Sequence, residues 1–217
     1  MAIRDPAIFP RFRSGDQATG PGGPATLSID IPQDALVVLI GPAGSGKSTF
    51  AREHFRSTEV VSSDACRALV ADDENAQDAT ADAFALLHFI VRRRLRAGRL
   101  TVVDATNVKP QSRAVLLAIA RRQRRPAVAV VLNLPEAVYR SRNGRRADRS
   151  VPADAVSFQR DLLVRSLPLL DKEGFAGVHV LDSEQTVAAA SVRRTPGSEL
   201  GSDPGQGPAI QTSLPLG

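Results

Sequence analysis

Short, continuous apolar runs recur along the chain, separated by longer segments whose apolar residues follow a helical period. An apolar run of four to eight residues between turn residues is typical of a strand that is buried on both faces. A shorter alternating segment, residues 27–31, predicts an edge strand in front of the first run. Five apolar runs predict parallel strands over residues 35–40, 58–62, 100–104, 127–133 and 178–181.

The segments between these runs predict helices. Proline stands at the start of three of them, at Pro110, Pro135 and Pro152, and Gly98 follows the end of another. Strands that alternate with helices are typical of a parallel sheet with crossover helices, so the pattern predicts an α/β fold with helices on both faces. The predicted helices cover residues 46–56, 64–70, 79–97, 110–124, 135–146 and 152–167.

The two ends of the chain differ from its middle in composition. Residues 1–26 and 191–217 are rich in Pro, Gly and Ser and have no apolar period. They predict a disordered N-terminal arm and a disordered C-terminal tail around one domain, residues 27–190. The N-terminus has no apolar signal region, and no run reaches the ~18 apolar residues of a membrane span. We therefore expect a cytoplasmic protein with no membrane partner, and the single cysteine, Cys66, excludes an internal disulfide.

Positive charge is concentrated in the predicted domain. The net charge of the chain is +5, but residues 36–182 carry 23 basic and 16 acidic residues, a net +7. Such an excess suits a nucleic acid or another phosphate ligand. The basic residues are almost all arginine, beside abundant Ala and Pro, which codon bias alone could produce. The run Arg92, Arg93, Arg94 and Arg96 is interpreted as a solvated helix face.

The stretch GPAGSGKST follows the strand predicted over residues 35–40 and precedes a helical pattern. This is the context that a phosphate-binding loop of the G-x-x-x-x-G-K-[ST] type requires, because its glycines let successive N–H groups point at phosphate oxygens. Lys47 is expected to reach the β- and γ-phosphates of ATP, and the Ser48 hydroxyl to ligate Mg2+. The residues expected to bind the nucleotide are Gly41, Ala43, Gly44, Ser45, Gly46, Lys47, Ser48 and Thr49.

Two carboxylates follow other predicted strands. Asp64 and Asp104 come at the ends of the segments VVSSD and LTVVD, so both should face the crevice that the phosphate loop faces. Asp64 is expected to accept a proton or to serve a metal ion, and Asp104 to serve Mg2+. The alternatives are helix capping by Ser63 or Asp64, with Arg67 as a surface ion-pair partner, and capping by Asp104, Thr106 or Asn107.

An arginine-rich segment follows the strand at 127–133. In YRSRNGRRADRS, guanidinium groups lie on either side of an Asn-Gly turn, as a lid over a transferred phosphate would require. Arg142 and Arg146 are assigned to this lid, whereas Arg140 and Arg149 are interpreted as solvated. The three histidines have no Cys or His at ligand spacing, so no zinc site is expected.

From about Leu36 to Ser183 the chain resembles the kinase domain of bacterial polynucleotide kinase, the 5′-end-healing part of an RNA repair enzyme. The matching stretches include VVLIGPAGSGKSTFAREHF, TEVVSSDACR, LTVVDATNV and RNGRRADR. The resemblance implies a P-loop kinase that transfers the γ-phosphate of ATP to a 5′-hydroxyl nucleic acid end. It implies roles for Asp64 as general base, Arg67 on the acceptor's phosphate, Arg142 as the lid arginine, and Gln77 in positioning the acceptor.

Other interpretations stay open. No phosphatase or ligase pattern follows the kinase segment, so either the kinase acts alone or its phosphatase and ligase partners are separate chains. A small-molecule kinase with the same fold, or an ATP-binding module without catalysis, would share the phosphate loop. The RNA-specific 2′-hydroxyl leaves no mark in residue spacing, so the sequence favours neither RNA nor DNA.

Overall fold

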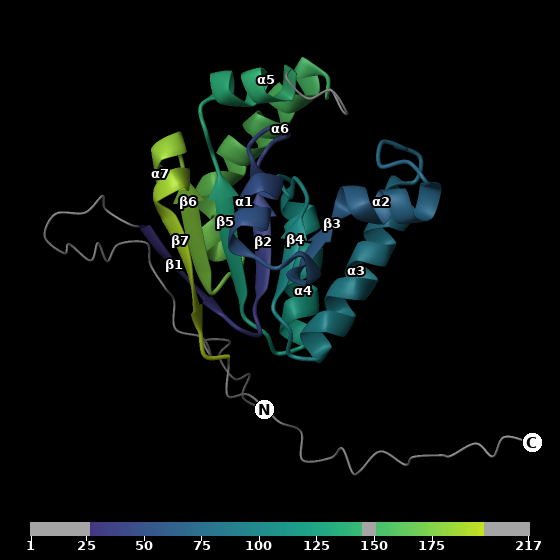
Figure 1. The fold of residues 1–217 in the computed structure, drawn as a ribbon, viewed down its shortest axis with the longest axis vertical. Coiled ribbons are helices and arrows are strands. Elements are labelled where there is room, and N and C mark those ends of the chain that lie inside the picture. The colour runs from purple at the N-terminus through teal and green to yellow at the C-terminus, as the bar shows by residue number, and fades with distance from the viewer. Residues whose placement is uncertain (1–26, 145–150, 198–217) are drawn as a thin grey trace, which may run out of the picture.

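The computed structural model describes residues 27–144 and 151–197 (Figure 1). Its centre is a five-stranded sheet of order β3-β4-β2-β5-β6, in which every neighbouring pair is parallel. All five predicted strands are confirmed. Their bounds are β2 Leu36–Ile40, β3 Val60–Ser62, β4 Thr101–Asp104, β5 Ala127–Leu132 and β6 Gly177–Leu181.

Helices cover both faces of this sheet, as predicted. Alternate residues of β2 explain why: Val38 packs into one apolar cluster with α3, α4 and α6, while Val37 packs into another with α1 and with β1, Leu27–Pro32. The helices are α1 Lys47–His54, α2 Ser63–Ala71, α3 Thr80–Arg96, α4 Pro110–Arg122, α5 Glu136–Gly144, α6 Ala153–Ser166 and α7 Glu184–Ala189. Two short 3-10 helices are also present, η1 Ser57–Glu59 and η2 Leu167–Lys172.

A second, two-stranded sheet joins the two ends of the domain. β1, Leu27–Pro32, pairs in parallel with β7, Ala190–Thr195, and Ile29 lies opposite Val192. The strand predicted over 27–31 is therefore present, but it does not extend the main sheet. Ile29 and Ile31 are completely buried against the α1 side, so this small sheet is part of the core.

The predicted start of the C-terminal tail is consequently wrong. Residues 191–195 form most of β7, and contacts with distant segments stabilise them: β7 pairs with β1, more than 150 residues earlier, and Arg194 pairs with Glu59. The short helix α7 in front of β7 was not predicted either. The proposed arm, residues 1–26, and the tail beyond residue 197 lie outside the described residues. None of the described helices is long and apolar enough to cross a membrane.

Candidate functional site

The loop between β2 and α1 has the backbone shape of a phosphate cradle. Gly44 and Gly46 adopt φ angles of 80° and 96°, which favour glycine. A Cβ atom at Gly41 would lie 2.9 Å from the carbonyl oxygen of Leu132 and 2.6 Å from Ser45 Oγ. The glycine spacing read from the sequence is thus required by the way that this loop folds against β5.

Lys47 is the first residue of α1 and is buried. Its Nζ donates to the carbonyl oxygen of Pro42 at 2.8 Å and lies 3.3 Å from Ser45 Oγ, so the ammonium group folds back onto the loop. The N-terminus of α1 adds the positive end of its dipole at the same place. A buried cation at the N-terminus of a helix, where backbone N–H groups point outward, is suited to an anion with several oxygens.

Asp104 ends β4 between the phosphate-loop strand and β3. Its Cα is in register with Leu39 on one side and with Ser62 on the other, and its side chain is largely buried. Capping is excluded as its role, because α4 begins after Lys109 with Pro110 at its first position and no side-chain cap. Asp104 therefore lies at the same carboxyl edge as the loop, as expected.

The turn after Asp104 is held by Asn107, which was expected at most to cap a helix, and by Arg113, which no sequence pattern marked. Asn107 has a left-handed φ of 49°, and its Nδ2 donates to the carbonyl oxygen of Leu39 at 2.8 Å. Arg113, with no exposed surface, donates from Nη1 to the carbonyl oxygens of Asn107 and Val108, both at 2.9 Å, and pairs with Glu173. No local pattern marks Arg113, since its partner lies 60 residues away.

Asp64 lies in the first turn of α2, where β3 ends. The cap of α2 is Ser62, whose Oγ accepts from the N–H groups of Asp64 and Ala65, so neither Ser63 nor Asp64 serves as the cap. The Asp64 carboxylate is 40% exposed and accepts from Arg67 Nη1 at 2.7 Å. It is thus positioned by an ion pair and open to solvent.

Arg67 is far more buried than a surface partner would be. Only 4% of the residue is exposed, and the same Nη1 also donates to the carbonyl oxygen of Glu74 at 2.8 Å. Its Nε is buried and has no hydrogen-bond partner among the described residues. Arg67 therefore connects the proposed base to the loop before α3, which also carries the exposed Gln77.

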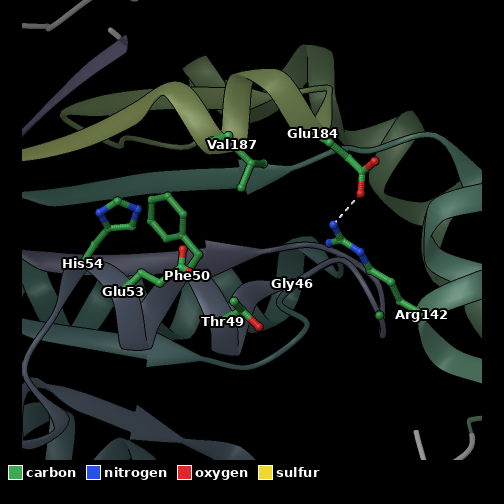
Figure 2. Close-up of a pocket in the computed structure, with 10 residues that line it drawn as sticks. Gly46, Thr49, Phe50, Glu53, His54, Arg142, Glu184 and Val187 are labelled. Atoms are coloured by element: carbon green, nitrogen blue, oxygen red, sulfur yellow. Dashed lines mark hydrogen bonds and ion pairs between the residues drawn. The ribbon is translucent and has the colours of Figure 1, made fainter. Parts of the chain in front are cut away.

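Arg142 extends from α5 over the phosphate loop. A Cβ atom on Gly46 would lie 3.0 Å from Arg142 Nη1, while Nη2 pairs with Glu184 of α7 at 2.6 Å (Figure 2). Tyr139 anchors α5, because it is completely buried and donates to the carbonyl oxygen of Leu132 at 3.4 Å. Burial raises the pKa of Tyr139 to about 12. The structure therefore brings the predicted lid arginine to the loop.

The remaining lid arginines differ in what the structure shows. Arg140 pairs with Glu136 one turn earlier on α5, as its interpretation as a solvated residue implies. Arg146 and Arg149 lie outside the described residues. At the base of the loop, the Ala43 N–H donates to Gln159 Oε1 at 2.9 Å, so α6 also supports the loop.

A pocket of about 480 Å³ opens beside the loop, between α1 and α7. Figure 2 shows Gly46 and Thr49 near the Arg142–Glu184 pair, and Phe50 and His54 at the other end. The rings of Phe50 and His54 lie 4.3 Å apart, and burial lowers the pKa of His54 below its usual 6.5. The pocket therefore has the Arg142–Glu184 ion pair at one end. At the other end lie the Phe50 ring and the His54 ring, which is uncharged near neutral pH, beside the carboxylate of Glu53.

These residues fit a nucleoside triphosphate. The loop supplies glycine-shaped space and a buried ammonium for the phosphates, and the adjoining pocket falls within the ~300–1,000 Å³ range of small-ligand sites. Ser48 and Asp104 offer oxygen donors, which Mg2+ prefers, and Mg2+ commonly takes only one or two protein ligands beside phosphate. Among the described residues, no group of three or more His, Cys, Asp or Glu side chains could hold a metal.

The fold and this loop define a P-loop kinase domain. The family model described as an AAA domain matches residues 36–168, more than half of the chain, and the chain belongs to this family. No curated protein sequence matches it.

Solved structures share the fold at low sequence identity. A chain of the Pnkp1/Rnl/Hen1 RNA repair complex is 22% identical with a TM-score of 0.57, over 65% of this chain and 47% of that one. The present chain thus spans about half of that protein's length. A candidate kinase of Chloroflexus aurantiacus is 16% identical with a TM-score of 0.52, over 70% and 86% of the two chains. A chain of the AvrRxo1-ORF1:AvrRxo1-ORF2 complex with ATP is 14% identical with a TM-score of 0.51, over 65% of this chain and 51% of that one.

Proposed function

We propose that the protein is an ATP-dependent polynucleotide 5′-hydroxyl kinase. The observation that carries this proposal is the Asp64–Arg67 pair. A half-exposed carboxylate, held at 2.7 Å by a buried guanidinium, lies at the carboxyl edge of the sheet that also holds the phosphate loop. A kinase of hydroxyl groups needs such a carboxylate on the acceptor side.

Each group has a defined role in this proposal. ATP supplies the γ-phosphoryl group, whose bond to the β-phosphate oxygen breaks as a bond to the 5′-oxygen forms, with ADP as leaving group. Asp64 orients the 5′-hydroxyl and accepts its proton. Lys47 and Arg142 offset the negative charge on the transferred group, and Ser48 and Asp104 hold Mg2+. Arg67 positions the carboxylate and is expected to bind the phosphate that follows the acceptor nucleoside.

Three further observations favour a nucleic acid as the acceptor. The residues of the phosphate loop, the Asp64 segment and the lid resemble those of bacterial polynucleotide kinase. One protein of similar fold belongs to an RNA repair complex. The domain also carries a net positive charge, which suits a polyanion. Separate phosphatase or ligase chains are proposed partners on the same grounds.

Transfer of labelled phosphate from ATP tests the function. Oligonucleotides with 5′-hydroxyl ends, in RNA and DNA form, should become labelled at the 5′ end in the presence of Mg2+. The Lys47→Ala variant should lose this activity, and its unchanged melting temperature would show that it is folded. Labelling of glycerol or of nucleosides alone would instead indicate a small-molecule kinase. ATP binding without transfer of phosphate to any hydroxyl group would instead indicate an ATP-binding module without catalysis.

A further inference from the structure

The C-terminal ends of α3 and α4 carry a dense group of arginines that the phosphoryl-transfer site does not use. α4 ends at Arg122, and Arg125 just beyond it donates from Nε to the carbonyl oxygen of Leu95, near the end of α3. Both helices end at the lower edge of the molecule in Figure 1, opposite the phosphate loop. The exposed arginines at this edge, here called the arginine surface, are Arg92, Arg93, Arg96, Arg99, Arg121, Arg122 and Arg124.

These arginines lack acidic neighbours. Within the parts of the chain that the structure describes, none of the seven has a carboxylate within ion-pair distance. Two carboxylates at the same edge of the sheet, Asp34 and Glu59, are already paired with Arg125 and Arg194. The positive charge of this edge is therefore left for another molecule.

The arginine surface differs from an ordinary solvated helix face, which was the interpretation from sequence. The interpretation of Arg94 as solvated was wrong: its Nη2 donates to the carbonyl oxygen of Leu100, so Arg94 is part of the fold and not of the arginine surface. A helix dipole favours one or two cations in a last turn, but Arg92 and Arg96 are like charges four residues apart, which weakens a helix. A polyanion bound here would remove that repulsion.

An aromatic ring extends the surface along α3. Phe89 is 49% exposed, and the guanidinium of Arg93 lies 5.4 Å from its ring centroid. Exposed rings beside guanidinium groups offer bases a place to stack, so a nucleic acid can use the ring for its bases and the arginines for its phosphates together. The combination favours single-stranded nucleic acid over an acidic protein as the partner.

α3 also connects this surface to the proposed acceptor site. It begins just after the loop that Arg67 contacts through Glu74, and its 17 residues span about 25 Å. We infer that the arginine surface binds the sugar-phosphate backbone of the acceptor strand at a distance from its 5′ end. This inference rests on the proposed function, and it makes strand length a determinant of affinity.

Binding of a 20-nucleotide single strand, labelled at its 3′ end, tests the inference by fluorescence anisotropy at several KCl concentrations. The variant Arg92→Gln/Arg96→Gln should bind about tenfold more weakly near 0.1 M salt, with the salt slope lower by about 1.4, the value for two single-strand phosphate contacts. Arg121→Gln/Arg122→Gln should behave alike. Arg165→Gln/Lys172→Gln removes two exposed charges elsewhere and should match wild type.

Phosphorylation of a dinucleotide, which is too short to reach the arginine surface, separates this inference from the proposed function. Its kcat/KM should be the same in wild type and in all three variants. Equal losses in the surface variants and the control variant, or equal losses on dinucleotide and 20-mer, would overturn the inference. So would polyglutamate competing as well as an oligonucleotide of equal charge. Tight binding that depends on the arginine surface, without phosphorylation of any acceptor, would contradict the proposed kinase function but support nucleic acid binding by this surface.

Discussion

At the scale of single residues, the candidate site depends on cations that are buried rather than displayed. Lys47 is folded onto the loop, and Arg67 is almost completely enclosed beside the half-exposed Asp64. The Arg67 guanidinium keeps a fixed position because its Nη1 donates both to the Asp64 carboxylate and to the carbonyl oxygen of Glu74. The proposed chemistry therefore has prearranged groups on both the donor and the acceptor side.

Substitutions at Asp64 and Arg67 should separate proton acceptance from acceptor binding. Asp64→Asn should lower turnover by ~10² to 10⁴, the usual loss for a general base, with ATP binding intact. Arg67→Ala should reduce transfer to a nucleoside 3′-phosphate by about 10- to 100-fold more than transfer to a nucleoside, because a charge-assisted hydrogen bond is worth about 1.5–3 kcal/mol. Steady-state kinetics on the two acceptors measures this. Equal losses would mean that Arg67 acts only by holding Asp64.

Arg142 should act on turnover more than on binding. Arg142→Ala is expected to lower kcat by about 10³ or more, as for other arginine fingers, while nucleotide affinity changes little. Arg142→Lys should recover little activity, because an ammonium group lacks the planar fork that contacts two oxygens. Single-turnover rates and titration with a fluorescent ATP analogue distinguish the two effects. A variant that loses only ATP affinity would make Arg142 a nucleotide-docking residue.

At the scale of elements, the α7–β7 segment connects the end of the domain to the pocket. Val187 and Ala188 of α7 line the pocket, and β7 follows directly. Arg194 of β7 pairs with Glu59 at 2.8 Å and lies over the Phe55 ring, at the end of α1. One wall of the pocket is thus attached to the helix that forms the other.

Truncations should show where the folded domain ends. Removing residues 198–217 should leave the melting temperature unchanged. Removing residues 191–217 deletes most of β7 and should lower it by about 5 °C or more, since ~1 kcal/mol corresponds to about 2–4 °C for a chain of this size. Differential scanning fluorimetry of both truncations tests this. Equal melting temperatures would mean that β7 contributes nothing to the stability of the domain.

At the scale of the whole molecule, all three histidines lie in environments that disfavour their charged form. Burial lowers the pKa of His54, His88 and His179, and the last has a buried Nε2 without a hydrogen-bond partner among the described residues. On unfolding, each imidazole regains a pKa of about 6.5. The unfolded chain therefore binds more protons than the folded one below that pH, and stability must fall as the pH falls.

This linkage predicts a measurable pH dependence. The free energy of unfolding should decrease between pH 7.5 and 5.5, a range in which unperturbed carboxylates remain ionised. Each unit by which the pKa of a histidine in the folded protein lies below its unfolded value lowers the free energy of unfolding by about 1.4 kcal/mol at the low-pH limit. His179→Leu should flatten the dependence, as urea titrations at the two pH values would show. An unaltered slope in this variant would assign the effect to other groups.

Much of the site follows from local spacing. The glycine pattern from Gly41 to Gly46, with Lys47 after it, predicts a tight turn before a helix, and the structure has it. Asp64 and Asp104 could be placed at the same edge because parallel strands end together. The unpredicted parts are contacts between distant segments, such as Arg142 with Glu184 and Arg113 with Glu173.

The sequence by itself therefore determined the five-stranded parallel sheet, the phosphate loop and the edge at which the candidate residues gather. These features depend on apolar runs and turn residues whose effects act within a few positions. Only the tertiary structure decided that residues 191–195 form a strand. The contacts that hold this strand join distant positions, 163 residues apart in the ion pair between Asp30 and Arg193, and no local pattern marks them. It also decided the burial of Arg67 and the pocket between α1 and α7, since burial depends on elements that pack together from distant parts of the chain.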